Sequence, residues 1–393
     1  MRYSCVPLGG LVTISGGGTP SRTNDRYWGG GIPWATVKDL KDINLFGTQE
    51  TITTEGLRDS ASNLIPAGSV IVATRMGLGK VAINTIDVTI NQDLKAFSCC
   101  DDLDPRYLLY FLLANASHLD SMGKGATVKG ITLDVLKDLS IPLPQLPEQK
   151  RIATILDKAD SIRRKRQEAV RLTEELLRSV FLDMFGDPVE NAKNWRLVPL
   201  GSAIRSIETG WSANSEDRPR EKDEWAVLKI SSVTSGRFLP GEYKVVADER
   251  IDRELLTPKR GDLLFSRANT RELVAATCLV EQDEPKLFLP DKLWKIIPDE
   301  HVTCTEYLRY LLSHPRFREK LTKQATGTSG SMLNISQAKV RSIEMPVPPL
   351  KLQKQFAEFV WRNYSIRNKL ESSFQCSDTL FNSLLQRAFK GEL

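Results

Sequence analysis

The sequence predicts an α+β protein, built as a tandem repeat of two α/β domains separated by two long antiparallel helices that form a coiled-coil rod. Three observations predict this fold class. Short motifs recur in the same order in the two halves, two long segments contain neither glycine nor proline, and a proline-rich stretch precedes each of those segments. The 393 residues, 41% hydrophobic and 26% charged, suffice for two or three domains with ordinary cores.

The repeat is recognised from six markers that keep their order along the chain. Pro7-Leu8-Gly9 recurs 192 residues later as Pro199-Leu200-Gly201, and by the end of the repeat the offset has grown to 204 residues. The insertions behind this drift therefore lie inside the globular parts. The other matched markers are Trp34–Lys38 with Trp225–Lys229, 65–75 with 257–267, Tyr107–Tyr110 with Tyr307–Tyr310, Ile131–Pro144 with Ile335–Pro348, and Gln149–Arg163 with Gln353–Arg367.

Each half begins with a globular domain of mixed character. Short β-branched and apolar runs such as Ser69–Thr74 and Asp262–Phe265, punctuated by glycine and proline, predict strands and turns. One amphipathic helix is expected near Pro105–Asn115, with a counterpart near Thr305–Ser313. We therefore expect the first domain over 1–147, the second over 187–349, and a long helix after each, over 148–186 and 350–393.

The two long segments are predicted to be helices. Glu148–Phe185 has no helix-breaking residue, and Gly186-Asp187-Pro188 supplies a C-terminal stop. The second copy runs from Leu352 to Phe389, and each helix would be about 55 Å long at 1.5 Å per residue. The apolar residues expected to be buried are Ile152, Ile155, Ala159, Ile162, Ala169, Leu176 and Val180 in the first helix, and Phe356, Phe359, Ile366, Leu370, Phe381, Leu384, Leu385 and Ala388 in the second.

Two helices of this length in one chain most simply pack on each other. Tandem units related by a two-fold axis place their final helices antiparallel, which predicts a dumbbell with both chain ends near the first domain. The alternative is parallel packing, which would require the connection after Pro188 to carry the second domain back along the helices.

Several classes of protein are disfavoured. The N-terminus lacks the apolar core of a signal peptide and no apolar run reaches about 18 residues, so we expect a cytoplasmic protein. Six cysteines without a C-x-x-C pair and only three histidines argue against a zinc site or a disulfide framework. No phosphate-binding loop, nuclease motif or methyltransferase motif is present, so we expect neither catalytic residues nor a bound metal.

Positive charge is concentrated on the first long helix. Between Lys150 and Arg171 there are eight basic and three acidic residues, a net charge of +5 that equals that of the whole chain. The simplest interpretation is a solvated helix face. Alternatively, the cations could face DNA phosphates or dock partner helices, and the residues concerned are Arg163, Arg164, Lys165 and Arg166.

Matched loops of the two domains combine small residues with basic and amide side chains. Ordinary turn chemistry explains any one of them, but their recurrence at equivalent positions favours a DNA-reading role for the set, because Arg, Lys and Asn can bond to base edges. The candidate DNA-binding residues are Gly18, Thr19, Arg22, Lys38, Arg75, Lys80, Lys124, Thr127 and Lys129 in the first domain, and Trp211, Ser212, Lys229, Arg267, Asn269, Arg271, Thr328, Ser329 and Ser331 in the second.

Three strings carry a resemblance to a known family. Ser15–Ser21 and Tyr27–Trp34 look like the opening of a target-recognition domain, and Ile141–Ala153 looks like the start of a central helical spacer. Over its whole length the chain resembles the specificity (S) subunits of Type I restriction-modification enzymes. The second copy, Leu350–Gln355, departs from the Pro-Glu-Gln pattern but keeps its frame through Pro346, Pro348 and Gln353.

The resemblance implies a function that the residues alone do not. It implies two target-recognition domains, each reading one half of an asymmetric, bipartite DNA site, and spacer helices that fix the gap and dock two modification subunits. Those partners would bind S-adenosylmethionine and methylate adenine N6, and two restriction subunits using ATP and Mg²⁺ could join them. The chain itself would hold no cofactor and catalyse nothing.

Two other interpretations remain open. A DNA-binding scaffold of the same fold could act without methyltransferase partners, in another defence or regulatory complex. The chain could also be an enzyme with an unrecognised site, and turnover by the isolated chain would support that interpretation.

Overall fold

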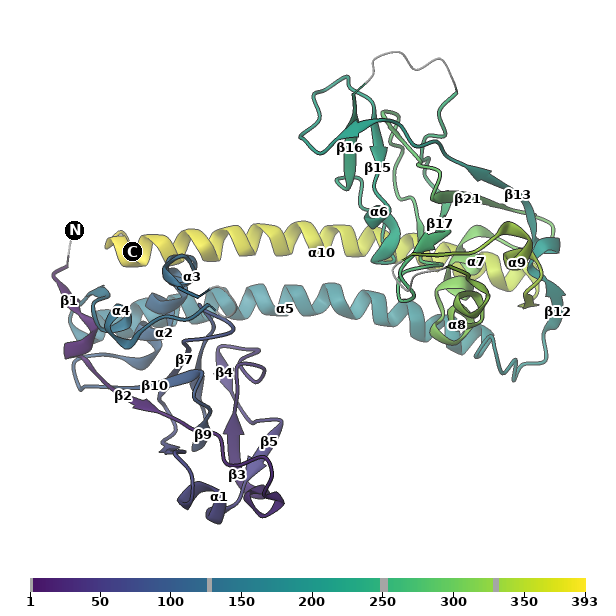
Figure 1. Cartoon of the computed structure of the whole chain (residues 1–393). Helices are drawn as coiled ribbons and strands as arrows, with labels where there is room; N and C mark the ends of the chain where they lie inside the picture. The colour runs from purple at the N-terminus through teal and green to yellow at the C-terminus, as the bar shows by residue number, and fades with distance from the viewer. Residues whose placement is uncertain (1–2, 126–128, 248–253, 328–331) are drawn as a thin grey trace. The chain divides into compact units, whose positions relative to one another are not determined.

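The computed structural model describes residues 3–125, 129–247, 254–327 and 332–393. The chain divides into two compact units, of which unit 1 comprises residues 1–168 and 371–393 and unit 2 comprises residues 169–370. Each unit therefore holds one globular domain together with a part of each long helix, and both chain ends belong to unit 1 (Figure 1).

The domain of unit 1 is built from short strands and helices around two main sheets. One sheet has the strand order β2-β10-β7-β8-β4, the other has the order β5-β3-β9-β6, and β1 pairs with β11. The elements are β1 (Cys5–Pro7), η1 (Leu8–Gly10), β2 (Val12–Gly16), η2 (Asp25–Tyr27), β3 (Trp28–Ala35), β4 (Asn44–Leu45), β5 (Glu50–Ile52), α1 (Thr54–Arg58), β6 (Leu64–Ile65), β7 (Val70–Ala73), β8 (Val81–Asn84), β9 (Val88–Ile90), β10 (Leu94–Cys99), α2 (Pro105–Ala114), α3 (Ala116–Met122), α4 (Leu133–Lys137) and β11 (Ser140–Pro142).

The domain of unit 2 repeats this plan. Its two main sheets have the orders β13-β21-β17-β19 and β14-β16-β15-β20, while β12 pairs with β23 and β18 with β22. The elements are β12 (Arg196–Pro199), η3 (Leu200–Ala203), β13 (Ile204–Thr209), β14 (Ser215–Glu216), β15 (Ala226–Leu228), α6 (Ser231–Thr234), β16 (Tyr243–Val246), β17 (Leu263–Ser266), β18 (Ala268–Asn269), β19 (Thr277–Leu279), β20 (Leu287–Phe288), β21 (Leu293–Pro298), α7 (Thr305–Ser313), α8 (Pro315–Gln324), β22 (Leu333–Asn334), α9 (Gln337–Arg341) and β23 (Glu344–Val347).

The long helices are confirmed as α5 (Leu146–Phe185) and α10 (Leu350–Lys390). Helix α5 begins two residues before the predicted bound at 148, since Pro147 fits into the first turn, and α10 begins at the predicted bound, Leu350. Gly186 ends α5 and Gly391 ends α10, each at a positive φ, of 76° and 77°, that glycine adopts without strain. The expected shorter helices are confirmed as α2 and α7.

In each unit a part of α5 lies beside a part of α10 (Figure 1). In unit 1 the guanidinium of Arg163 pairs with Asp378 at 3.2 Å and that of Arg166 bonds to the carbonyl of Ser373 at 2.8 Å. A later residue of α5 thus meets an earlier residue of α10, so the helices are antiparallel there, as the sequence predicts.

Each long helix contributes to both cores. The residues of α5 in the hydrophobic cores are Ile152 and Leu156 in unit 1 and Leu177, Phe181 and Phe185 in unit 2, and α10 adds Phe381 and Leu385 in unit 1 and Phe356 and Val360 in unit 2. The predicted stripe is wrong at Ile162 and Leu176 of α5 and at Ile366 of α10, which are 50%, 47% and 49% exposed. Because each helix packs against a globular domain as well as against the other helix, its buried face is displaced from the one that spacing alone predicts.

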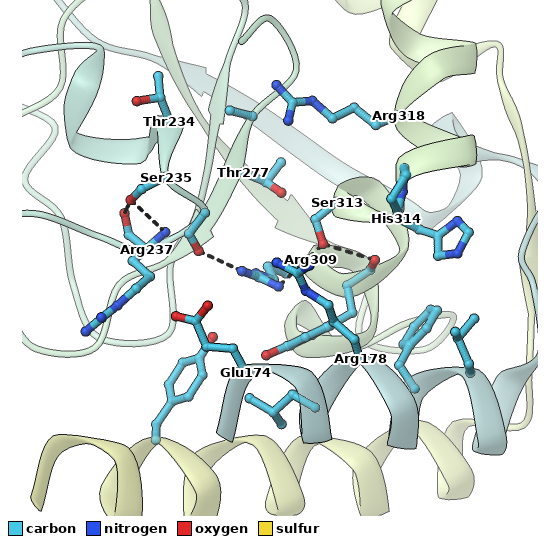
Figure 2. A pocket seen from close by; sticks show the side chains of 18 of the residues that line it. Glu174, Arg178, Thr234, Ser235, Arg237, Thr277, Arg309, Ser313, His314 and Arg318 are labelled. Atoms are coloured by element: carbon cyan, nitrogen blue, oxygen red, sulfur yellow. Dashed lines mark hydrogen bonds between the residues drawn. The ribbon is translucent and has the colours of Figure 1, made fainter. Parts of the chain in front are cut away.

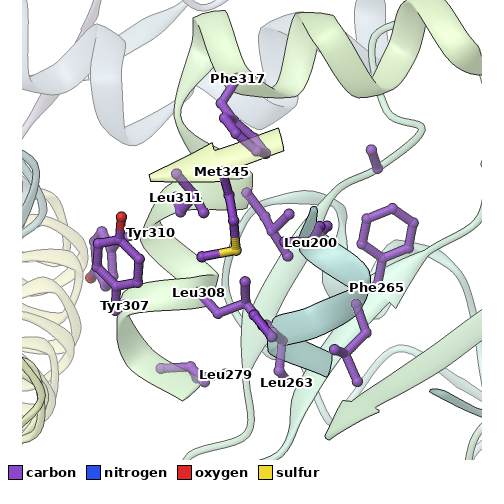
Figure 3. Close-up of a cluster of buried hydrophobic side chains, with 14 of the residues drawn as sticks. Leu200, Leu263, Phe265, Leu279, Tyr307, Leu308, Tyr310, Leu311, Phe317 and Met345 are labelled. Atoms are coloured by element: carbon purple, nitrogen blue, oxygen red, sulfur yellow. The ribbon is translucent and has the colours of Figure 1, made fainter. Parts of the chain in front are cut away.

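The core of unit 2 joins the sheet to these helices. Phe265 of β17 stacks on Trp294 of β21 at 5.6 Å between ring centroids, and Tyr307 of α7 packs against Phe181 and Phe185 of α5. Figure 3 shows Leu263 and Phe265 gathered with Leu308 and Leu311 of α7 around Met345. This packing positions the ends of the central strands, where the candidate loops lie.

Candidate nucleic-acid interface

In unit 1 the predicted loops converge at the start of β10. The hydroxyl of Thr19 donates to Oε1 of Gln92 at 2.6 Å, and the backbone amide of Thr74 donates to the carbonyl of Asp93 at 2.8 Å. The loop after β2 and the loop after β7 are therefore both held by residues 91–93. These two loops carry the candidates Thr19 and Arg75.

A third loop joins the same cluster. Arg75 forms a β-bridge with Gly130, whose amide and carbonyl bond to Lys124 at 3.0 and 2.9 Å. Lys129 makes an ion pair with Asp120 at 3.5 Å. The structure thus brings Arg75, Lys124 and Lys129 together, with all three exposed, and Lys80 is also exposed at the end of the Arg75 loop.

Arg22 lies in a separate aromatic arrangement. Its guanidinium stacks on the ring of Trp28 at 3.7 Å and makes a bidentate ion pair with Glu50. The hydrogen bonds from Arg22 lower the pKa of the Glu50 carboxyl. Lys38 is exposed and adds a second positive charge near Glu50. Bidentate pairing fixes the guanidinium plane, which suits it for directional recognition of a polar partner.

Glycines let these loops pass close to a strand end. A Cβ at Gly17 would lie 1.8 Å from the carbonyl oxygen of Ile90, and a Cβ at Gly210 would lie 1.9 Å from that of Leu289. Gly18 is buried, and its carbonyl accepts hydrogen bonds from the Trp34 indole at 2.9 Å and from a serine hydroxyl at 3.0 Å. The backbone of Gly18 therefore packs against residues of its own domain.

Unit 2 repeats the loop framework with different side chains. Ser212 donates to the carboxylate of Asp291, whose carbonyl accepts from Nε of Arg267 at 2.8 Å and whose carboxylate pairs with the same guanidinium at 3.3 Å. The carbonyl of Arg267 accepts from the amide of Ile335 at 2.9 Å. Ser212 and Asp291 thus occupy the places that Thr19 and Gln92 hold in unit 1. Arg267 stands at the position of Thr74, whose carbonyl accepts from the amide of Ile131 at 3.0 Å, one residue before the position of Arg75.

The remaining candidates of unit 2 surround this framework. Trp211 stacks on Phe288 at 5.9 Å, and Lys229 pairs with Asp217 at 3.0 Å on the other sheet. The side chain of Asn269 accepts from the amide of Thr270 at 2.8 Å, a local turn contact, and Arg271 is exposed beside it.

Four further candidates, one in the first domain and three in the second, lie outside the described residues, namely Thr127, Thr328, Ser329 and Ser331.

The residues that link these loops, Gln92, Asp93 and Asp291, are not among the candidates that the sequence predicts. The repeat could have indicated them, because Gln92 and Asp291 are polar residues at equivalent positions, each two residues before a strand, β10 or β21. These residues hold the cationic side chains in place, and their polar atoms lie beside the candidates.

The cations of α5 are mostly engaged within unit 1. Arg163 bonds to Asp160 and Asp378, and Arg164 bonds to Asp160 and Asp42. Arg166 bonds to α10 as described above, which leaves Lys165 exposed among the four residues. This charge arrangement favours a helix-packing role for the three arginines over the phosphate-facing one.

Within the described ranges, no group of three or more metal-ligating side chains is present. None of the helices described is long and apolar enough to span a membrane. The loops of both units instead present guanidinium, ammonium, amide and hydroxyl groups, which are the groups that contact phosphates and base edges of DNA.

Comparison with known proteins gives a consistent result. A family model, the Type I restriction modification DNA specificity domain, matches residues 3–172 and 194–373, one match for each half of the repeat. The chain is 24% identical over 361 residues to the Type I restriction enzyme MjaIX specificity subunit of Methanocaldococcus jannaschii, which covers 87% of this chain and 82% of the relative.

Two solved structures share the fold. The S subunit of a Type I restriction-modification system from M. genitalium aligns with a TM-score of 0.60 and 14% identity, over 99% of this chain and 96% of that one. A chain solved in work on complex assembly and conformational transition of the type I R-M system aligns with a TM-score of 0.54 and 18% identity, over 100% and 98% of the two chains.

Proposed function

The chain belongs to the Type I restriction modification DNA specificity family, and on this premise we propose that its two units read the two halves of a bipartite, asymmetric DNA site. It is a DNA-recognition chain and not a catalytic one. Unit 1 would read one half-site through the loops that carry Thr19, Arg75 and Lys124. Unit 2 would read the other through the loops that carry Ser212 and Arg267.

One observation carries the proposal, namely that the same loop framework occurs twice with different side chains. In unit 1 the linking position contributes the neutral amide of Gln92, whereas in unit 2 it contributes the carboxylate of Asp291, which holds Arg267. Two similar frameworks dock in similar ways on a duplex, whose two strands are related by two-fold symmetry. Because the donors and acceptors differ, the preferred bases of the two half-sites differ.

We propose that the long helices set the distance between the half-sites. A helix of about 55 Å caps the separation at about 16 base pairs if it lies along the DNA axis. The contribution of the helices to this spacing is a fixed length.

The exposed apolar side chains of the helices support docking of partners. Ile162 and Leu380 are 50% and 56% exposed in unit 1, and Leu172, Leu176 and Ile366 are 49%, 47% and 49% exposed in unit 2. Apolar side chains on an exposed helix face mark protein contact surfaces. We propose that two modification (methyltransferase) subunits and two restriction subunits assemble with this chain in the cytoplasm, and that these partners supply S-adenosylmethionine, ATP and Mg²⁺.

Copurification with the modification subunit tests the docking surface. Leu176→Glu places a charge in the proposed contact and should abolish recovery of the modification subunit with the tagged chain. Leu197→Glu is the matched control, because Leu197 is equally exposed, at 49%, but lies on β12. Equal recovery with both variants would contradict docking at this face. If the wild-type chain binds DNA but recovers no modification subunit, the scaffold alternative is favoured.

A further inference from the structure

Unit 2 contains a cavity that the DNA-reading role does not use. It has a volume of about 510 Å³ and lies between the second part of α5, the α7–α8 corner and the segment that follows α6. Five arginines contribute to its lining, whereas Glu174 is the one carboxylate among the lining residues that are described. Figure 2 shows Arg309, Ser313 and Thr277 around the same space.

Among the described residues, no carboxylate is hydrogen-bonded to Arg309 or Arg318, and Glu174 acts on Arg309 only through space. The Arg309 guanidinium donates to the carbonyl of Gly236 at 2.6 Å and to the hydroxyl of Ser313 at 3.4 Å. The Arg318 guanidinium donates only to backbone carbonyls, those of Glu272 at 2.7 Å and of Val274 at 3.1 and 3.2 Å, and burial lowers its pKa. A half-buried guanidinium surrounded by neutral acceptors is stabilised by an anion.

Further polar groups of the cavity are unsatisfied within the described structure. The hydroxyl of Thr277 is buried, with the residue 2% exposed, and it has no hydrogen-bond partner. Nδ1 of His314 is also buried without a partner. Helix α8 begins at Pro315, on the cavity wall, without a side-chain cap, and the N-terminus of a ten-residue helix favours negative charge. Buried polar atoms are normally paired, so these atoms mark a candidate binding site for a polar ligand.

The other half of the repeat shows that the fold does not require this polar lining. Tyr107 and Tyr307 both donate to a proline carbonyl, at 2.8 and 2.7 Å, which places Leu109 at the position of Arg309. Val81 pairs with Val72 of β7 in unit 1, and Thr277 pairs with Phe265 of β17 in unit 2, so Val81 stands at the position of Thr277. Leu109 and Val81 are buried in the hydrophobic core. Unit 2 thus replaces apolar core residues with polar ones that surround a cavity.

We propose that this cavity binds a small phosphate-bearing anion, up to the size of a mononucleotide. Guanidinium groups bind phosphate oxygens through planar pairs of N–H donors, and the hydroxyls and the helix N-terminus add further donors. The volume falls within the range of about 300–1,000 Å³ that is typical of small-molecule sites, and exceeds what a single water or a chloride would fill. The phosphate could come from a free ligand or from the DNA backbone, and competition with duplex DNA distinguishes the two sources.

Titration of the full-length chain with inorganic pyrophosphate by isothermal calorimetry tests this site. We expect saturable binding at one site per chain. Arg309→Gln should raise the dissociation constant at least tenfold, and Thr277→Val, which introduces the residue found in unit 1, should raise it severalfold. Arg205→Ala is the matched control, because Arg205 is an exposed cation of the same unit outside the cavity, and it should leave binding unchanged.

Three results would overturn the proposal. The first is the absence of saturable binding, and the second is equal weakening in the Arg205→Ala control, which would show an adventitious ion only. The third is displacement of pyrophosphate by duplex DNA together with an equal loss of DNA affinity in Arg309→Gln, which would assign the site to a backbone phosphate. If Arg309→Gln fails to fold by circular dichroism, Thr277→Val decides the outcome.

Discussion

The side chains of Gln149 and Gln353 make the same contacts in the two units. Both are fully buried. The side-chain oxygen of Gln149 accepts the amide of Asp104 at 2.9 Å, and that of Gln353 accepts the amide of Cys304 at 3.1 Å. Each side-chain nitrogen donates to the carbonyl of the proline five residues earlier, at 2.9 and 2.8 Å. The first turn of each long helix is thereby tied to the start of the shorter helix of its domain.

Loss of this tie should destabilise the unit concerned. Gln149→Ala would remove the hydrogen-bond partner of the Asp104 amide and of the carbonyls of Asp102 and Pro144, and we expect a loss of about 2–3 kcal/mol in the free energy of unfolding of unit 1. Gln353→Ala should do the same to unit 2. Urea denaturation followed by circular dichroism measures both. Gln355→Ala, at an exposed position of α10, is the control, and an equally large effect there would refute the argument.

The loop glycines should tolerate no side chain. Gly17→Ala and Gly210→Ala would place Cβ within 2 Å of a backbone carbonyl oxygen, so the loop must move and we expect a loss of about 1–3 kcal/mol or more. DNA binding by the affected unit should fall with it. Gly10→Ala is the matched control, because nothing lies within 4 Å of a Cβ there. Thermal unfolding compares the three variants, and a Gly17→Ala protein as stable as the control would contradict the close approach.

Arg75 and Arg267 should act on different half-sites. Arg75→Ala removes a cation for which the described residues provide no side-chain partner, whereas Arg267→Ala also releases the Asp291 carboxylate. Each change should relax base preference in one half-site by about 1–3 kcal/mol and leave the other half-site unchanged. Binding to a library of randomised duplexes measures this. A uniform loss of affinity over all sequences would instead identify a phosphate contact.

The spacer hypothesis predicts a specific change in gap length. Deletion of residues 166–172 from α5 together with 367–373 from α10 removes seven residues from each helix at positions that face each other, as the Arg166–Ser373 contact shows. The helices would shorten by about 10 Å, which corresponds to about three base pairs. Determination of the methylated motif gives the gap directly, and an unchanged gap in the double deletion would refute the hypothesis.

The elements that follow from local rules were predictable from the sequence. The long helices end at Gly186 and Gly391 because glycine adopts the positive φ of a helix stop, and the repeat of Tyr107 as Tyr307 located α2 and α7 correctly. Hydrophobic spacing identifies a helix well, since it depends only on residues three or four positions apart.

Features that depend on tertiary contacts were not predictable. Ile162 fits the apolar spacing of α5, yet it is half exposed because the buried face also follows the globular domain. The basic residues of α5 suggest a free charged face, but Arg164 meets Asp42, which is 122 positions away in the sequence. The link between Ser212 and Arg267 through Asp291 likewise joins residues far apart in the chain. No pattern in a single sequence encodes such pairs.

Single-molecule mapping of DNA methylation tests the central claim most directly. The chain is coexpressed with the modification subunit encoded beside it, in a host that lacks adenine methylation, and a culture without the chain is the control. We predict N6-methyladenine at an asymmetric motif split into two halves by an unread gap, and only when the chain is present. Methylation that does not depend on the chain, or a motif in one uninterrupted block, would contradict the proposal that two units read two half-sites.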